Sequence, residues 1–294
     1  MATYKTYDTI GIREDLQDAI YDISPTTTPF MSTVGRTKAK NTYHEWQTDS
    51  LADVNLANAQ VEGADAVSST LTPTTRVGNY TQISDKVIQV STTDDVVDKA
   101  GRSTETAYQL SKASAEIKRD MESILLSDQA QDAGGSATPR KLGGLASWLT
   151  TNTVNTAGGA LTEEMLKEAV LKAYNSGGEP DVLLVSPANK QVVSTFAGIA
   201  EQRYQAPKSS PTTIIGAADV YLSDFGSVSV VPDRFLSDDF SYVLDPSMAS
   251  VAYLRPFKSQ KLAKMGDSEK HLLNVEYTLV VNNEAAHAMM SDET

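Results

Sequence analysis

The longest run of periodic apolar positions lies between residues 103 and 128 and predicts one long helix. Successive apolar side chains are three or four residues apart, which places them on a single helical face. They are Ala107, Leu110, Ala113, Ile117, Met121, Ile124 and Leu125. At about 1.5 Å of rise per residue, such a helix is roughly 40 Å long. It cannot bury its apolar face alone, so we expect a sheet to cover it.

A strand pattern near the C-terminal end supplies the expected sheet. Between residues 272 and 281 apolar and polar side chains alternate, which is typical of a strand with one buried and one mostly solvated face. The apolar positions are Leu273, Val275, Tyr277, Leu279 and Val281. Shorter strands are expected at 242–244, 251–254 and 257–262. We therefore expect this late sheet to pack beneath the early helix, with the chain leaving its first domain, building an insertion and returning.

Residues from about 150 to 240 carry a different mixture of patterns and predict a second domain. Thr162 precedes two glutamates and should begin a helix, because its hydroxyl can accept a first-turn N–H. Ser186 and Pro187 provide an N-cap and a first helical residue in the same way. The other expected elements are a buried strand over 181–185 and a hairpin over 220–231.

Two strand-like stretches, 41–49 and 74–90, enclose a segment without any periodicity. Residues 50–73 are small, polar and acidic. An unstructured connection of 24 residues is uncommon inside a compact domain, where most loops have about 4 to 6 residues. Either the segment is disordered or something outside the domain orders it. Two strands that lead out and back favour a protruding hairpin that a neighbouring subunit receives.

The first thirty-five residues read as an arm. Pro25 and Pro29 bias the residues before them to extended conformations. The spacing of apolar residues predicts one short helix, over 8–21.

Composition then narrows the classes of function. The 294 residues suffice for one large domain or two of ordinary size. The absence of cysteine excludes disulfides, thiolate nucleophiles and cysteine-ligated metals, and three histidines leave little for acid–base chemistry. A net charge of −13 disfavours sequence-specific binding of DNA, because most of such a surface repels phosphate. No run of about 18 apolar residues predicts a membrane span, and we expect no secretion signal.

Few residues suggest catalysis. No phosphate-binding loop, paired-glycine fingerprint, HExxH motif or nucleophile elbow occurs. Acidic doublets at 94–95 and 163–164 fall in the first turns of helices that we expect to begin after Ser91 and Thr162, where the helix dipole explains them. His44 and Glu45 are adjacent on a strand and so point to opposite faces. We expect no enzyme, no cofactor and no metal site; a serine hydrolase with a triad from distant positions stays open as an alternative.

One basic series stands out against the acidic background. It has a basic residue at every third position, and no acid lies between residues 246 and 265. In a regular strand this spacing alternates between faces unless the backbone bulges. Three interpretations are open. The basic residues are solvated lysines of an edge strand, or they pair with acidic surfaces of adjacent subunits, or they contact nucleic acid. The series comprises Arg255, Lys258, Lys261 and Lys264.

Five segments together are similar in order and spacing to one family, and they span nearly the whole chain. They are SPTTTPFMSTVG at 24–35, NTYHEWQTDSLA at 41–52, GRSTETAYQLSKASAEIKRDME at 101–122, SPANKQVVSTF at 186–196 and the long segment 243–290. In these segments the chain resembles the major capsid, or major head, proteins of tailed bacteriophages.

The resemblance implies an α+β fold, the Hong Kong 97-like capsid fold, with four parts. These are an N-terminal arm at 1–37, an extended loop with β arms at 38–90, a peripheral domain with the spine helix and long sheet at 91–145 and 240–294, and an axial domain at 146–239. By the same resemblance, the loop at 50–73 lies across a neighbouring subunit and the arm around Thr28 laces another.

The implied function is structural. The resemblance implies self-assembly into hexamers and pentamers of an icosahedral head around double-stranded DNA, built in the host cytoplasm and located in the virion. The implied partners are other copies of the chain, with scaffolding, portal and decoration proteins besides; since the chain starts almost at the arm, we expect a separate scaffold or none. A cargo-enclosing nanocompartment shell of the same fold is the alternative. The candidate inter-subunit contacts are Thr28, Pro29, Phe30, Trp46, Arg255, Lys258, Lys261 and Lys264.

Overall fold

The computed structural model describes residues 26–63, 65, 68, 71–97, 104–156, 158–196, 219–264 and 266–292. The helix expected at 8–21 lies outside them. The helices are α1 (Pro29–Thr33), α2 (Thr92–Val96), α3 (Glu105–Leu126), α4 (Leu145–Trp148), α5 (Glu163–Asn175) and α6 (Pro187–Val193), with 3₁₀ turns η3 (Pro246–Met248) and η4 (Glu284–Ala286). The strands are β1 (Gly35–Lys38), β2 (Tyr43–Thr48), β3 (Thr75–Tyr80), β4 (Gln82–Ser91), β5 (Thr153–Asn155), β6 (Val182–Val185), β7 (Val220–Ser223), β8 (Gly226–Pro232), β9 (Phe240–Leu244), β10 (Ala249–Lys261), β11 (Ser268–Val281) and β12 (Ala288–Ser291).

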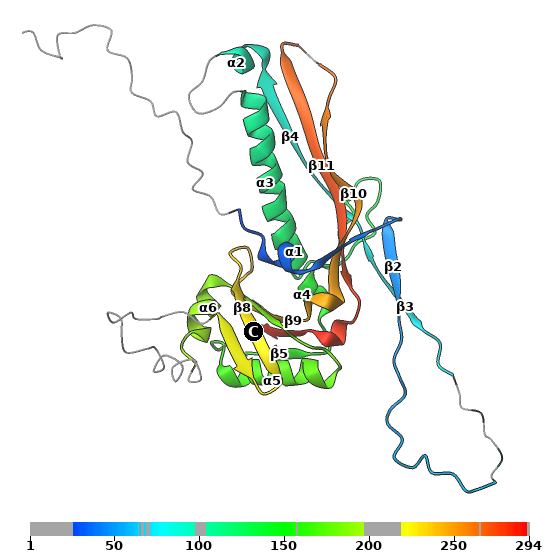
Figure 1. Cartoon of the computed structure of the whole chain (residues 1–294). Coiled ribbons are helices and arrows are strands. Elements are labelled where there is room, and N and C mark those ends of the chain that lie inside the picture. Colours follow the sequence, from blue (N-terminus) through cyan, green and yellow to red (C-terminus); the bar gives the residue numbers. More distant parts are fainter. Residues whose placement is uncertain are drawn as a thin grey trace, which may run out of the picture.

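The long helix α3 lies along a four-stranded sheet of order β1-β10-β11-β4, as Figure 1 shows. Its buried face includes Ile117, Met121 and Leu125, which join one apolar core with Tyr277 and other side chains of β11. The prediction that the late sheet packs against the early helix is therefore confirmed. The apolar stripe is buried only from Ala113 onward, since Ala107, near the start of the helix, is exposed.

Strand β11 is buried on both faces near its C-terminal end, so the prediction of a solvated second face was wrong there. Glu276, Thr278 and Val280 point away from α3 and are all buried. The second face is covered because the strands of the hairpin begin beside it: the Thr278 hydroxyl donates to the Tyr80 carbonyl at 2.8 Å. Val280 also packs in a small apolar cluster that includes Ala39.

A second, six-stranded sheet has the order β5-β12-β9-β6-β8-β7. Helices α5 and α6 cover the face that carries the second apolar core, and the other face joins the core of α3. Two of its strands, β9 and β12, come from the segment 240–294, which we assigned to the peripheral domain from the sequence. Short apolar strands fit either sheet by pattern; the pairing of β9 with β6 and β12 decides where they belong.

The predicted helix starts are confirmed in detail. The hydroxyls of Ser91, Thr162 and Ser186 accept the N–H groups of the residues three positions on, so each caps a first turn. Two helices are shorter than the sequence pattern predicts: α2 ends at Val96 rather than just before Gly101, and α6 ends at Val193 rather than near Gly198.

Truncating the core face of α3 should destabilise the chain strongly. Leu125 has no exposed surface, so Leu125→Ala removes buried methyl groups and leaves a cavity, at a cost of about 2–5 kcal/mol. The matched control is Leu51→Ala, because Leu51 is 98% exposed and its truncation should change stability by less than about 0.5 kcal/mol. Urea unfolding of the unassembled chain measures both; equal effects would contradict the assignment of this core.

Candidate inter-subunit surfaces

Strands β2 and β3 form an antiparallel hairpin that leaves the body of the molecule and ends in a long loop (Figure 1). We call residues 49–74 the extended loop; its described residues form no helix or strand. Five aliphatic side chains in it are almost fully solvated, with Leu51 at 98% and Leu56 at 96% exposure. The others are Val54, Val61 and Leu71. The protruding hairpin that the sequence predicts is thus present, and these five side chains are left uncovered by the described part of the chain.

The extended loop is also acidic. It carries Asp49, Asp53, Glu62 and Asp65, and no lysine or arginine occurs from residue 41 to residue 75. Any surface that covers this loop must therefore offer apolar contacts and positive charge, since an acidic surface would repel it.

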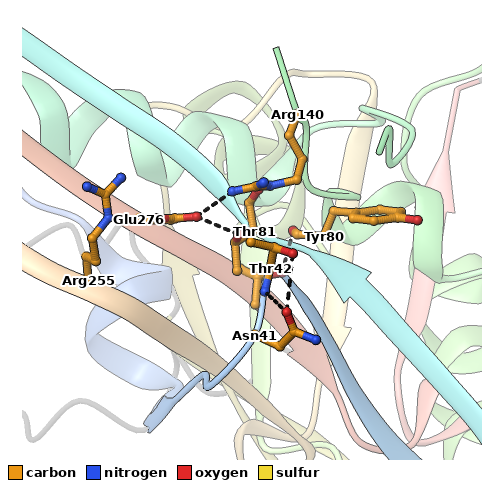
Figure 2. A network of polar contacts seen from close by, with 8 residues as sticks. Asn41, Thr42, Tyr80, Thr81, Arg140, Arg255 and Glu276 are labelled. Atoms are coloured by element: carbon orange, nitrogen blue, oxygen red, sulfur yellow. Dashed lines mark hydrogen bonds and ion pairs between the residues drawn. The ribbon is translucent and has the colours of Figure 1, made fainter. Parts of the chain in front are cut away.

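A buried carboxylate fixes the base of the hairpin to the sheet (Figure 2). Glu276, only 4% exposed, accepts hydrogen bonds from the Thr81 hydroxyl at 2.8 Å, from Arg140 Nη2 at 2.5 Å and from Arg255 Nε at 2.7 Å. Arg140 also donates from Nε to the Thr81 carbonyl at 2.6 Å. The two guanidinium groups compensate the cost of burying one carboxylate, which would otherwise be high. This network joins β11, β10 and the turn between β3 and β4.

Asn79, two residues before Thr81, forms a second buried anchor of the hairpin. The Asn79 side chain donates to the carbonyls of Gly143 and Leu279 and accepts the Gly143 N–H at 2.8 Å. Its neighbour Gly78 leaves no room for a side chain, because a Cβ there would lie 2.8 Å from the His44 carbonyl oxygen. The hairpin therefore leaves the sheet from a fixed position.

Trp46 belongs to the same anchoring region. Its ring is half-buried and lies 5.5 Å from the ring of Trp148, centroid to centroid. It also packs against the small cluster formed by Ala39, Ala252 and Val280. Trp46 thus holds the hairpin to its own subunit, while its predicted contact with a neighbour stays a prediction.

The arm residues are placed differently from one another. Pro29 is the first residue of α1 and, like Thr28, is half-buried. Phe30 is only 1% exposed and lies in the core of its own subunit, since the turn of α1 points its ring toward α3. Of these three arm residues, only Thr28 and Pro29 keep surface that a neighbour could contact.

The basic series falls on two faces of the four-stranded sheet. Arg255 pairs with Glu276 and Lys258 with Asn274, so both point away from α3, and a register shift between them makes this possible. Lys261 pairs with His271 and points to the α3 side. The series is therefore not one continuous stripe.

Most of these basic side chains already have acidic partners in the chain. Arg255 binds Glu276, Lys261 binds Glu269 at 2.7 Å, and Lys264 lies 3.8 Å from Asp267. Lys258 is exposed and has no ion pair among the described residues. Of the four, Lys258 is the best placed to meet an acidic group from outside.

Apolar side chains lie beside Lys258 on the same sheet face. Ile83 and Val87 of β4 are 48% and 53% exposed, and the register places Leu272 directly across from Val87. We call Ile83, Val87, Arg255, Lys258 and Leu272 the receiving face. It combines exposed apolar area with two basic groups, and it also carries the exposed Asp85, which lies opposite Asn274 between Ile83 and Val87. The extended loop has exposed apolar area but no basic group.

The chemistry of the described residues gives little support to catalysis. They contain no group of three or more histidine, aspartate or glutamate side chains that could hold a metal ion. His287 is buried and its Nδ1 accepts the Asp245 N–H at 3.1 Å, and His271 lies 4.0 Å from Glu269 with 16% of its side chain exposed. Among these same residues, no helix is both long enough and apolar enough to cross a membrane.

Comparison with known proteins agrees with this picture of a protein built for contact. The family model described as the SU10 major capsid protein matches residues 2–294. The chain belongs to this family. It is 30% identical over 340 aligned residues to the major capsid protein of Escherichia phage Phieco32, covering 98% of this chain and 96% of that protein. As a member of the family it is a structural protein of a tailed phage, and it forms the capsid shell of the virion.

Solved structures confirm the capsid fold. A chain from Microbacterium phage Oxtober96 superposes with a TM-score of 0.67 at 10% identity, covering 99% of this chain and all of the other. The holo-SrpI encapsulin complex from Synechococcus elongatus PCC 7942 superposes with a TM-score of 0.60 at 14% identity, covering 99% and 96%. At such identities the likeness concerns the fold alone.

The anchoring residues at the hairpin base could not be found from the sequence. Glu276 occupies a polar position of an alternating strand, and this pattern predicts a solvated side chain. Thr81, Arg140 and Asn79 carry no local signal either, because their partners lie about 60 to 200 residues away. Only the pairing of β3, β4 and β11 brings them together.

Removing the buried charge at the hairpin base should destabilise the subunit. Glu276→Gln leaves Arg140 without its carboxylate partner, which costs about 3 kcal/mol for a buried ion pair. Glu45→Gln is the control, because its pair with Arg76 is exposed and should matter far less. Chemical unfolding checks the difference, and a similar small loss in both variants would show that the network does not hold the hairpin.

Proposed function

We propose that this protein assembles into hexamers and pentamers of an icosahedral head that encloses double-stranded DNA. Its main partner is the same chain, and scaffolding, portal and decoration proteins are further partners of the head. The observation that supports self-assembly most directly is the extended loop, because Leu51 and Leu56 are almost completely solvated in the isolated subunit. Large apolar side chains gathered on a projecting segment mark an interaction site.

The receiving face of an adjacent subunit is the proposed position of the extended loop. The loop has four acidic residues and no basic one, while the receiving face offers Arg255 and Lys258 beside Ile83 and Val87. Burial of each leucine contributes about 1.5–3 kcal/mol, and opposite charges set the orientation. Repeated around a capsomer, this contact links every subunit to the next.

The four-part division of the chain remains our proposal for the assembled shell. We place the arm at 1–37, the extended loop and its strands at 38–90 and the spine helix with the four-stranded sheet in the peripheral domain. The axial domain is then 146–239 together with β9 and β12, which complete its sheet.

The acidity of the chain fits a shell around DNA. With 38 acidic and 25 basic residues, most of its surface repels phosphate, so packaged DNA is enclosed without being held at specific positions. The same fold in an encapsulin supports a cargo-enclosing nanocompartment as the second candidate. The two differ in content: a phage head takes up DNA and a nanocompartment takes up protein.

Electron microscopy of the purified protein, alone and with the neighbouring gene products of the phage, tests the proposal. We expect capsomers or closed icosahedral shells, with nucleic acid in particles recovered from infected cells. A chain that stays monomeric under every assembly condition would overturn the proposal, and particles that contain only protein cargo would favour the nanocompartment.

Charging the apolar positions of the extended loop should block shell closure without unfolding the subunit. Leu51→Asp combined with Leu56→Asp places carboxylates where apolar contact is proposed, so we expect at least a tenfold lower yield of closed particles. Ser50→Asp with Asn55→Asp adds the same charge one residue earlier and should assemble better. Sedimentation and microscopy measure the yield, and circular dichroism checks the fold. Equal yields from the two double variants would contradict the role of the leucines.

A further inference from the structure

A pair of buried carboxyl groups holds the short helix α1 to the spine helix. Glu122 of α3 has no exposed surface, and its two oxygens accept the Phe30 N–H at 2.6 Å and the Met31 N–H at 3.0 Å. These are amides of the first turn of α1, and the side chain of the N-cap residue Thr28 makes no capping bond. Glu122 therefore caps α1 from another part of the chain, and the N-terminal arm is attached here.

The second carboxyl group belongs to Asp233, in the connection between β8 and β9. Its side chain is also fully buried and faces Glu122 closely enough to form a hydrogen bond with it when a proton is present. Asp233 Oδ1 accepts the Phe235 N–H at 2.8 Å, whereas Oδ2 has no partner among the described residues. The backbone N–H of Asp233 is bound to the Val185 carbonyl, which fixes the position of the residue.

No cation balances this pair within the described part of the chain. The charged and titratable groups around it are few: Tyr253 of β10 lies near Glu122, and Arg36 of β1 lies near Tyr253. Arg119, one turn earlier on α3, places its guanidinium over the Phe235 ring at 5.3 Å, and Arg234, the residue after Asp233, is exposed.

Two carboxylates in a dry site without a cation cannot both be ionised at low cost. Burial, followed by the proximity of Asp233, raises the pKa of Glu122 to about 8, and burial raises the pKa of Asp233 as well. A single shared proton resolves the conflict, because it supplies the donor that Asp233 Oδ2 lacks and leaves the Glu122 oxygens able to accept the α1 amides.

We propose that Glu122 and Asp233 act as a one-proton latch that holds α1, and with it the start of the arm, on the spine helix, and that loss of this proton releases α1. The proton connects three segments that are far apart in sequence: α1, α3 and the β8–β9 connection. The arm can thus be loosened by solvent conditions while α3 stays packed on its sheet. This inference rests on the subunit alone and does not depend on the proposed architecture of the shell.

The direction of the pH effect follows from the raised pKa. With α1 bound, the pair keeps its proton up to about pH 8, whereas a solvated glutamate loses it near its ordinary pKa of 4.5. The bound state therefore holds about one more proton between these values, and the equilibrium for release should rise roughly tenfold per pH unit and level off above about pH 8. The latch is closed in acid and weakest in alkali.

Hydrogen exchange of the full chain between pH 5.5 and 8.5 tests the latch. After correction for the intrinsic exchange rate, protection of the peptide that contains Phe30 and Met31 should fall at least about a hundredfold over this range. Protection of the β11 peptide 275–281, which the latch does not touch, should stay constant. A flat profile for the α1 peptide in the unaltered protein would overturn the proposal without any variant.

Three variants test whether the pH dependence of α1 protection comes from this pair of carboxyl groups. Asp233→Asn keeps the acceptor for the Phe235 N–H and supplies a permanent donor to Glu122, so the pH dependence should shrink to less than about threefold while α1 stays protected. Glu122→Gln should flatten the profile in the same way. Glu116→Gln, the same change on the same helix at a residue paired with Lys86, should keep the full dependence. A steep profile that survives in both Asp233→Asn and Glu122→Gln would assign the effect to other groups.

Discussion

The packing of the apolar face of α3 against two sheets is the contact on which the other parts of this subunit depend. Ile117, Met121 and Leu125 lie in one core that reaches from β11 in the four-stranded sheet to β6 and β9 in the six-stranded sheet. The Tyr242 hydroxyl, on β9, donates to the Leu126 carbonyl at 2.7 Å and ties the end of the helix to the second sheet. Because one core serves both sheets, the body of the subunit can carry long projections without losing its shape.

Those projections are attached by polar contacts rather than by further apolar core. At the hairpin base a buried glutamate is compensated by two arginines, and at the arm a buried pair of acids is compensated by a proton. Both arrangements are costly to bury, and both fix direction better than an apolar contact does, because hydrogen bonds require specific geometry. The hairpin and the arm thereby leave the body at defined points, as repeated contacts between identical subunits require.

The sequence predicted the elements well and the environment of individual residues less well. The α3 stripe, the caps at Ser91, Thr162 and Ser186 and the protruding hairpin were all readable, because each depends on neighbours within a few positions. Phe30 shows where this reasoning stops: its segment reads as an extended arm, yet its ring is buried against α3. Glu276 shows the same limit, since a polar position in an alternating strand predicts exposure and the hairpin base covers it.

By itself the sequence determined the local structure, the absence of cysteine chemistry, the acidic surface and, through its resemblance to phage head proteins, the family. Local structure could be predicted because periodicity and capping depend on residues within one or two helical turns. Net charge and composition follow directly from the sequence. Only the tertiary structure decided which sheet received β9 and β12, which basic residues share a face, and which acids are buried. These depend on strand pairing and register across about 10 to 200 residues, and a single bulge, as between Arg255 and Lys258, moves a side chain to the other face.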